Sequence, residues 1–496
     1  MKNLSSETRQ ILLLMAIGLF VRLLILPFSQ TIDADAVTRI FMAYKWLKDP
    51  ELITSAVWLP LHLYFNAAAI WLSGDLVFGP KLMNILFAVA TVPPLYKFVK
   101  NEFNSEGAFW VTLTYLFVPI VIRNSLQALS GIPYAFFIVL AMYFLSQGRK
   151  TQKQIKYGIL AGLAITLAGG FRYEAWLLIA VFTAVLFFQK QWKMMIAFMI
   201  FSMIVPGFWM IGCYIDEGDI FFGPNGAYRW NVIVSGVNEH MNFEKYLRRT
   251  FFFFISWFFL LTPVVSFLIV FYTIKSRKLK SVSRDTWLWL IPFVVLFLMF
   301  IYKALNGTLL LQHRFTLSLI LTSLPFYALM FQDGKSLKIK RIIALSVVIL
   351  FIPYSFLNRD ILSIPRLKDQ GMVDLVELIN SKTIDPQHEG LVLDFIGWQN
   401  TYYLSLKSDI IPENIFRVNG AAHGKVYFKF LKRVFVNNEE GFLLKRKKKK
   451  SKLDQYLEQV NDSLIVIKKA KLELHLKEVY TDDKVRLYRY KTSEIQ

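Results

Sequence analysis

Cysteine is almost absent from this 496-residue sequence, which contains only Cys213, inside an apolar run. No intrachain disulfide can form, so the cysteine content does not indicate a redox compartment. The sequence also lacks the glycine-rich fingerprints of P-loop and dinucleotide-binding proteins, and it has no Cys/His cluster of the kind that holds a metal ion. No small-residue cleavage site follows the first apolar run, residues 11–28, which we therefore interpret as a retained signal anchor.

Acidic residues are also scarce, with 35 Asp or Glu against 57 Lys or Arg and a formal net charge of +22. In a soluble protein this excess would suggest a nucleic-acid partner. Here Lys and Arg crowd the short loops between apolar runs, as the positive-inside rule requires, so we expect no nucleic acid. With 55% hydrophobic residues and a mean hydropathy of +0.43, the chain carries more apolar side chain than a soluble fold of this length can bury.

Long apolar runs recur until about residue 357, and each membrane-spanning helix needs roughly 20 such residues. The sequence therefore predicts an α-helical polytopic membrane domain of about eleven spans over residues 1–357. The expected spans cover residues 11–28, 80–98, 108–123, 129–146, 157–171, 174–189, 193–214, 251–274, 286–303, 314–332 and 339–357.

The basic loops alternate along the chain and so define a cytoplasmic side, which includes the N-terminus. An odd number of spans then places the C-terminus outside, in a bacterial or archaeal plasma membrane. The outer side also receives residues 29–79, which are too long for a plain connector. Within them, Trp58 to Phe65 opens a stretch that is short for a span and rich in Trp and Tyr, so we interpret it as an interfacial helix.

The pattern changes near Asn358, and residues 358–496 predict a small soluble α/β domain outside the membrane. Helical apolar spacing predicts helices over residues 371–381 and 398–406. Strands are expected over residues 390–395, 441–444, 472–480 and 484–490.

An unbroken basic run, Lys445 to Lys450, interrupts this soluble domain. We interpret the run as a solvated loop, which is the ordinary role of clustered like charges. The alternative is that it contacts anionic lipid headgroups or a phosphorylated glycolipid.

Two acidic residues, Asp33 and Asp35, directly follow the first span, and Arg39 lies four residues after Asp35. On the outer side, a carboxylate here would meet an outer-leaflet substrate and could act as a general base toward an acceptor hydroxyl. Arg39 would keep Asp35 ionised and oriented. The alternative is structural: one aspartate caps the following helix and Arg39 pairs along it. Spacing alone favours the cap.

Two further groups of charged residues lie at expected outer ends of spans. Arg172 and Glu174 occupy a tight turn between short apolar runs, where they are costly unless they are used or exposed; they form either a functional pair or an interfacial ion pair. His313 and Arg314 open a late span, where they either donate to a lipid phosphate or snorkel to the interface. We expect the lone His62 to be interfacial rather than a metal ligand.

These motifs, in this order, resemble those of the glycosyltransferase C superfamily, most closely the branch with protein O-mannosyltransferases and lipid A aminoarabinose transferases. The resemblance covers essentially the whole chain, and its specificity lies in the order of the motifs and their membrane side. The matching segments are Asp33-Ala34-Asp35, Trp58-Leu59-Pro60-Leu61-His62, Gly79-Pro80-Lys81, Pro119 with Arg123, Arg172-Tyr173-Glu174, His313-Arg314-Phe315 and Asp482-Asp483-Lys484-Val485-Arg486.

The resemblance implies a membrane glycosyltransferase whose donor is a sugar on a polyprenyl or dolichyl phosphate. Transfer would take place on the non-cytosolic side, with inversion, to a hydroxyl of a protein or glycolipid acceptor. No cofactor is implied, and a requirement for a divalent metal stays open. The implied residues are Asp33 or Asp35 as the base, Arg172, His313 and Arg314 at the donor phosphate, and Arg39, His62 and Glu174 in support.

Two departures from the family pattern affect the expected site. The aminoarabinose branch has a Lys-Pro-Pro stretch whose lysine meets phosphate, whereas this chain has Trp58-Leu59-Pro60. Relatives often carry an acid before the fourth span, whereas this chain has Leu129-Ser130-Gly131, so a second catalytic acid is unsupported. The competing functions are a transporter or flippase, which would need more charge at mid-membrane depth, and a polymerase or ligase of lipid-linked saccharide.

Overall fold

The computed structural model divides into two compact units, a helical unit and a smaller second unit. The helical unit contains residues 1–30 and 42–364, and the second unit combines residues 31–41 with residues 365–496. The residues that the structure describes are 5–28, 34–51, 58–235, 242–279, 282–332, 336–357, 370–383, 385, 387–394, 396, 398–418, 424–447, 453–456, 458–461, 464–467 and 470–494.

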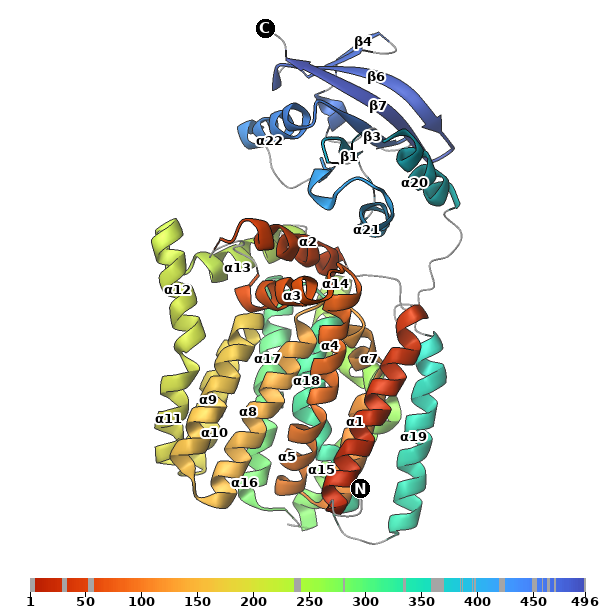
Figure 1. Ribbon diagram of the computed structural model, residues 1–496. Coiled ribbons are helices and arrows are strands. Elements are labelled where there is room, and N and C mark those ends of the chain that lie inside the picture. Colours follow the sequence, from red (N-terminus) through yellow and green to blue (C-terminus); the bar gives the residue numbers. More distant parts are fainter. Residues whose placement is uncertain are drawn as a thin grey trace. The chain divides into compact units, whose positions relative to one another are not determined.

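The helical unit is a bundle of apolar helices (Figure 1). Its elements are α1 (Ser6–Ile25), η1 (Leu26–Phe28), α3 (Pro60–Ser73), α4 (Phe78–Ala90), α5 (Val92–Glu102), α6 (Ser105–Phe117), α7 (Pro119–Ser125), α8 (Gly131–Thr151), α9 (Gln154–Phe171), α10 (Glu174–Phe188), α11 (Trp192–Ser202), α12 (Ile204–Glu217), α13 (Phe222–Ser235), α14 (Phe243–Leu260), α15 (Pro263–Leu279), α16 (Arg284–Trp287), η2 (Leu288–Leu290), α17 (Ile291–Leu305), η3 (His313–Phe315), α18 (Thr316–Ser323), η4 (Leu324–Phe331) and α19 (Leu337–Leu357). Helix α2 (Ala34–Lys48) begins in the second unit and ends in this one.

Among the described residues, seven helices are long and apolar enough to cross a membrane, or nine if each of two bent pairs is one span. The two expected runs that this set does not include, 174–189 and 339–357, correspond to α10 and α19. Each expected spanning run is therefore largely helical in the structure. The prediction of a multi-pass helical membrane protein is confirmed.

One expected span, residues 251–274, is not a single helix. It is divided into α14 and α15, which meet at an angle of 101°. The cause is Pro263, because the residue before a proline is disfavoured in the helical conformation; Thr262 instead takes a positive φ of 64°. Pro119 has a similar effect between α6 and α7, which meet at 58°.

Helix α3 lies across one end of the bundle, which we call the α3 end (Figure 1). Pro60 occupies its first turn, where the missing N–H costs nothing, and Gly74, with φ of 67°, ends it. The expected helix in this stretch is therefore present. Leu61 of α3 packs so closely on α9 that a Cβ at Gly170 would lie 2.4 Å from its Cδ1. A glycine at position 170 is thus what lets α3 reach the last turn of α9.

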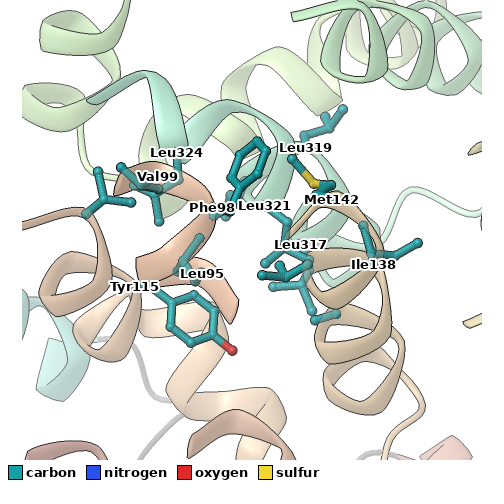
Figure 2. Packing of buried hydrophobic residues seen from close by; sticks show 14 of the residues in the cluster. Leu95, Phe98, Val99, Tyr115, Ile138, Met142, Leu317, Leu319, Leu321 and Leu324 are labelled. Atoms are coloured by element: carbon teal, nitrogen blue, oxygen red, sulfur yellow. The ribbon is translucent and has the colours of Figure 1, made fainter. Parts of the chain in front are cut away.

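The core of the bundle is built from side chains of α5, α6, α8, α18 and η4, among others. Figure 2 shows part of it, where Phe98 and Val99 of α5, Met142 of α8 and Leu319 of α18 come together. Tyr115 and Leu321 in the same region have no exposed surface or almost none. Such close packing holds the helix ends, and therefore the polar groups on them, in fixed positions.

A buried ion-pair network lies at the other end of the bundle, where α5 and α8 finish. Glu102 has a fully buried side chain and accepts from both Arg149 NH2 at 2.5–2.7 Å and Thr286 Oγ1 at 3.2 Å. Arg149 also contacts Asp285 Oδ2 at 3.0 Å. Since a buried charge is stable only when it is paired and hydrogen-bonded, this network ties α5, α8 and α16 together.

The second unit contains a seven-stranded sheet of order β2-β1-β3-β7-β6-β5-β4. Strands β2, β1 and β3 are parallel and the remaining pairings are antiparallel. The elements are α20 (Gln370–Lys382), β1 (Gly390–Asp394), α21 (Trp398–Lys407), η6 (Pro412–Asn414), β2 (Ile415–Arg417), α22 (Gly424–Asn437), β3 (Glu440–Arg446), η7 (Leu453–Gln455), β4 (Glu458–Asn461), β5 (Leu464–Ile467), β6 (Leu472–Thr481) and β7 (Val485–Glu494).

Helices pack on both faces of this sheet. Because alternate residues of a strand point to opposite sides, neighbouring residues of β1 contact different helices. Leu391 and Leu393 of β1 pack with α20 and α21, whereas Val392 packs with α22. The two expected helices and four expected strands are present. Helix α22 and the short strands β2, β4 and β5 were not predicted.

The buried pair Glu102–Arg149 should contribute much more to the free energy of unfolding than the exposed pair Glu106–Arg341. Replacing Glu102→Gln leaves Arg149 buried with only Asp285 as a charged partner, and we expect the free energy of unfolding to fall by about 3 kcal/mol. Replacing Arg341→Gln breaks the bidentate Arg341–Glu106 pair, whose arginine side chain is 52% exposed, and should change little. Thermal unfolding of the detergent-solubilised protein measures both. Equal losses of unfolding free energy in the two variants would contradict the conclusion that the buried Glu102 network stabilises the fold more than the exposed Arg341–Glu106 pair does.

Candidate functional site

Arg172 and Glu174 form a bidentate ion pair at the α3 end of the bundle. Arg172 NH2 lies 2.5 Å from Glu174 Oε1 and Arg172 Nε lies 3.3 Å from Glu174 Oε2. The two side chains are only 11% and 13% exposed. The pair exists because α9 ends at Phe171 and α10 begins at Glu174, so that Arg172, in extended conformation, places its side chain beside the first turn of α10.

Two aromatic rings from other helices flank the guanidinium of Arg172. Its Cζ lies 4.9 Å from the ring centroid of Phe315 and 5.7 Å from that of Tyr134. Arg314 Cζ lies 5.7 Å from the same Phe315 ring. The structure therefore brings Arg172 and Arg314, two residues predicted to meet a phosphate, to one aromatic side chain. Cation–π contacts of this kind orient a guanidinium without neutralising it.

His313 is held by a hydrogen bond and by ring stacking. Its Nδ1 is 2.8 Å from Ser256 Oγ on α14, and its ring stacks on Phe252 at 5.1 Å. Ser256 Oγ is also 2.7 Å from Thr316 Oγ1 at the start of α18. These contacts fix the direction of the imidazole, and Nε2 is the ring nitrogen directed away from Ser256.

His62 of α3 is buried, with 1% of its surface exposed. Its Nε2 is 3.3 Å from Asn66 Nδ2 one turn later, and its ring meets Phe171 edge-on at 6.5 Å. Because Phe171 directly precedes Arg172, His62 supports the backbone from which Arg172 projects.

The connection between α7 and α8 reaches the same site. A Cβ at Gly131 would lie 4.0 Å from Arg172 NH1 and 3.6 Å from Asn124 Nδ2. Asn84 of α4 donates to the carbonyl of Leu129 at 3.0 Å and also to that of Gln127. The segment from Leu129 to Gly131, where the resemblance led us to look for a second acid, thus lies beside Arg172, and it offers backbone groups there.

The acidic pair is only partly within the described residues. Asp33 lies outside them, whereas Asp35 lies in the first turn of α2, which begins at Ala34. Arg39 follows one turn later on the same helix and is half-buried. Asp35 and Arg39 belong to the second unit, and Arg172, His313 and Arg314 belong to the helical unit. In the described part of the chain, no group of three or more His, Cys, Asp or Glu is arranged to hold a metal ion.

Comparisons with known proteins show which fold the chain shares with solved structures. The model of the family described as dolichyl-phosphate-mannose-protein mannosyltransferase matches residues 56–211, the stretch that contains His62, Arg172 and Glu174. The structure of ArnT from Cupriavidus metallidurans in the apo state matches with a TM-score of 0.64 and 12% identity, over 98% of each chain. The chain has the glycosyltransferase C fold.

Two further structures with this fold were solved with a lipid phosphate. ArnT from Cupriavidus metallidurans bound to undecaprenyl phosphate matches with a TM-score of 0.63 and 11% identity, over 97% of this chain and 98% of that chain. The oligosaccharyltransferase AglB from Archaeoglobus fulgidus, in complex with an inhibitory peptide and a dolichol-phosphate, matches with a TM-score of 0.51 and 12% identity, over 89% of this chain and 70% of that chain. No curated protein sequence matches the chain.

Several residues of the site within the glycosyltransferase C fold gave no signal in the sequence. Tyr134 lies within an apolar run, and nothing local distinguishes it from neighbouring core residues. Ser256 and Asn84 are polar residues with apolar neighbours on both sides in the sequence, and their partners are 57 and 45 positions away. A polar residue on an expected spanning helix is the only sequence signal that could have identified them.

The ion pair of Arg172 and Glu174 can be tested by a double-mutant cycle. Arg172→Gln leaves a carboxylate almost buried without its partner, so we expect a loss of about 3–5 kcal/mol in unfolding free energy. The double variant Arg172→Gln with Glu174→Gln should recover most of that loss, because no unpaired charge remains. Thermal unfolding of the purified protein measures the coupling. Additive losses would show that the two side chains stabilise the fold independently.

Proposed function

We propose that this chain is a membrane glycosyltransferase that moves a sugar from a polyprenyl- or dolichyl-phosphate donor to an acceptor hydroxyl. The observation that carries the proposal is the likeness to ArnT over 98% of both chains. The match to the mannosyltransferase family model over residues 56–211 agrees with it. Undecaprenyl phosphate in ArnT and dolichol-phosphate in AglB are ligands of those proteins; their common chemistry supports a lipid-phosphate donor here.

The reaction transfers the anomeric carbon from phosphate to the acceptor. The acceptor oxygen forms the new bond while the bond from the anomeric carbon to the phosphate oxygen breaks, and the electron pair leaves with the phosphate. The proton of the acceptor hydroxyl passes to a carboxylate. Attack opposite to the leaving group inverts the anomeric centre. Such a site needs a base on one side of the sugar and fixed positive charge where the phosphate develops its charge.

Asp33 and Asp35 are the candidates for the base, and either one satisfies the sequence position. Asp35 lies in the first turn of α2, and Arg39 follows one turn later on the same helix. An ionised carboxylate is the state that can accept the acceptor proton.

Arg314 and His313 are the better candidates for direct phosphate contact, with Arg172 beside them. Arg172 already has Glu174 as a bidentate counter-ion, so this pair brings little net charge to a phosphate. Arg314 shares the Phe315 ring with Arg172, which places a second guanidinium in the same region. We further propose that the N-terminus is cytoplasmic and that transfer takes place on the opposite side, as the basic loops favour.

Removal of the base provides the principal test. Asp33→Asn and Asp35→Asn should each be assayed for transfer of sugar from a synthetic polyprenyl-phosphate donor, with product mass measured. The variant that lacks the true base should lose roughly 100- to 10,000-fold in turnover. Asp49→Asn, an exposed aspartate just past the end of α2, is the matched control and should retain activity. Wild-type rates in both single variants and the double variant would refute the assignment. A product containing several sugars would indicate a polymerase or ligase instead.

Loss of a phosphate ligand should affect donor binding first. Arg314→Gln is expected to raise the KM for the lipid-phosphate donor by roughly 10-fold or more, because a hydrogen bond to a charged group is lost. Arg314→Lys should restore part of the affinity since the charge remains. The exposed Arg248→Gln on α14 is the charge-matched control. An unchanged donor KM in Arg314→Gln would exclude Arg314 from the phosphate site.

A further inference from the structure

The basic run of the second unit begins on a strand rather than in a loop. Lys445 and Arg446 are the last residues of β3, and Lys447 follows directly. From Lys445 to Lys452, seven of eight residues are Lys or Arg. Residues 448–450 of the run lie outside the described residues.

Other cations meet this run at the same edge of the sheet. Strand β7 is antiparallel to β3, so the start of β7 lies beside the end of β3, with Lys445 opposite Arg486. The backbone N–H of Lys447 donates to the carbonyl of Lys484 at 2.9 Å. We call the described cations Lys445, Arg446, Lys447, Lys484 and Arg486 the basic edge. Four of its five residues, all but Lys445, are exposed.

Nearby acids neutralise only part of the basic edge. Lys445 pairs with Asp454, and Arg486 approaches Glu478 at 4.0 Å. Asp482 accepts hydrogen bonds from the backbone of the β6–β7 turn, at 2.6 Å from Lys484 N. Neither Arg446 nor Lys447 forms an ion pair with any residue that the structure describes. The cations on the two strands, including the directly opposed Lys445 and Arg486, therefore outnumber the acids that the structure places beside them.

The second unit, which carries the basic edge, is joined to the membrane-spanning helices by a short stretch of chain. Twelve residues separate the end of α19 from the start of α20, and they span roughly 40 Å at full extension. An exposed row of cations so tethered meets a surface of many separate negative charges, which can contact several side chains at once. Juxtamembrane basic segments bind anionic lipid headgroups by this means. We propose that the basic edge binds the anionic headgroups of the bilayer in which the chain is anchored.

Amine labelling of the full-length protein in nanodiscs tests this proposal. Discs are prepared with phosphatidylcholine alone or with about 30% phosphatidylglycerol. Acylation of each lysine is then followed by mass spectrometry. We expect labelling of Lys447 and Lys484 to slow by about threefold or more in the anionic discs, and to recover at about 0.5 M salt. Lys382 and Lys471 are exposed and lie toward the other end of β7, because the Lys382 carbonyl accepts from Arg489 NH1 and Lys471 precedes Leu472, which pairs with Glu494. They should therefore label equally in both discs.

A pair of charge-matched variants separates the basic edge from general charge. Arg446→Gln with Lys447→Gln should abolish the lipid-dependent protection of Lys484, whereas Lys382→Gln with Lys471→Gln should leave it intact. Equal labelling of Lys484 in the two kinds of disc would overturn the proposal. Protection of Lys484 by soluble polyphosphate in neutral discs, to the extent given by anionic discs, would also overturn it, because the partner would then be a dissolved polyanion. Neither outcome depends on transferase activity.

Discussion

A charge removed from water needs an opposite charge or hydrogen bonds, and this requirement decides where polar chemistry can lie in the helical unit. The clearest ion pairs with buried partners, Glu102–Arg149 and Arg172–Glu174, are at opposite ends of the bundle. Arg22 on α1 is fully buried and meets the same requirement differently. It donates to Ser125 Oγ and to the carbonyl of Gly18, each at 3.1 Å, beside the carboxyl end of α7. The negative end of that helix dipole favours a cation there.

The same requirement explains how the bundle accommodates broken helices. Pro119 interrupts a long apolar run, and the chain from α7 to α8 then leaves carbonyl groups without helical partners. Within a membrane such groups are tolerated only where the protein satisfies them. Asn84 reaches the carbonyls of Gln127 and Leu129, and Arg22 holds Ser125. The irregular segment next to Arg172 is therefore fixed by specific hydrogen bonds, and a fixed segment can line a binding site.

Long apolar runs made the helical fold predictable, because burial in lipid demands them at every span. The 101° bend at Pro263 was missed, since the run 251–274 is apolar on both sides of the proline. In the second unit, β2 has three residues, too few for a pattern. The pairing of Arg172 with Glu174 follows from their spacing, whereas Tyr134 and Phe315 reach Arg172 only because α8 and η3 pack there. Contacts between helices that are distant in the sequence cannot be predicted from the residues next to Arg172.

The Arg172–Glu174 pair also limits what Arg172 can do in a phosphate site. A phosphate that contacted this guanidinium would also lie near the Glu174 carboxylate. The two negative charges would repel each other strongly, because little water is present to screen them. Glu174 engages the Nε and NH2 groups of Arg172, so the pair as a whole presents little net positive charge. Net positive charge at a bound phosphate would then have to come from residues other than Arg172. Among the predicted residues of the helical unit we propose Arg314 for this role, because its guanidinium shares the Phe315 ring with that of Arg172.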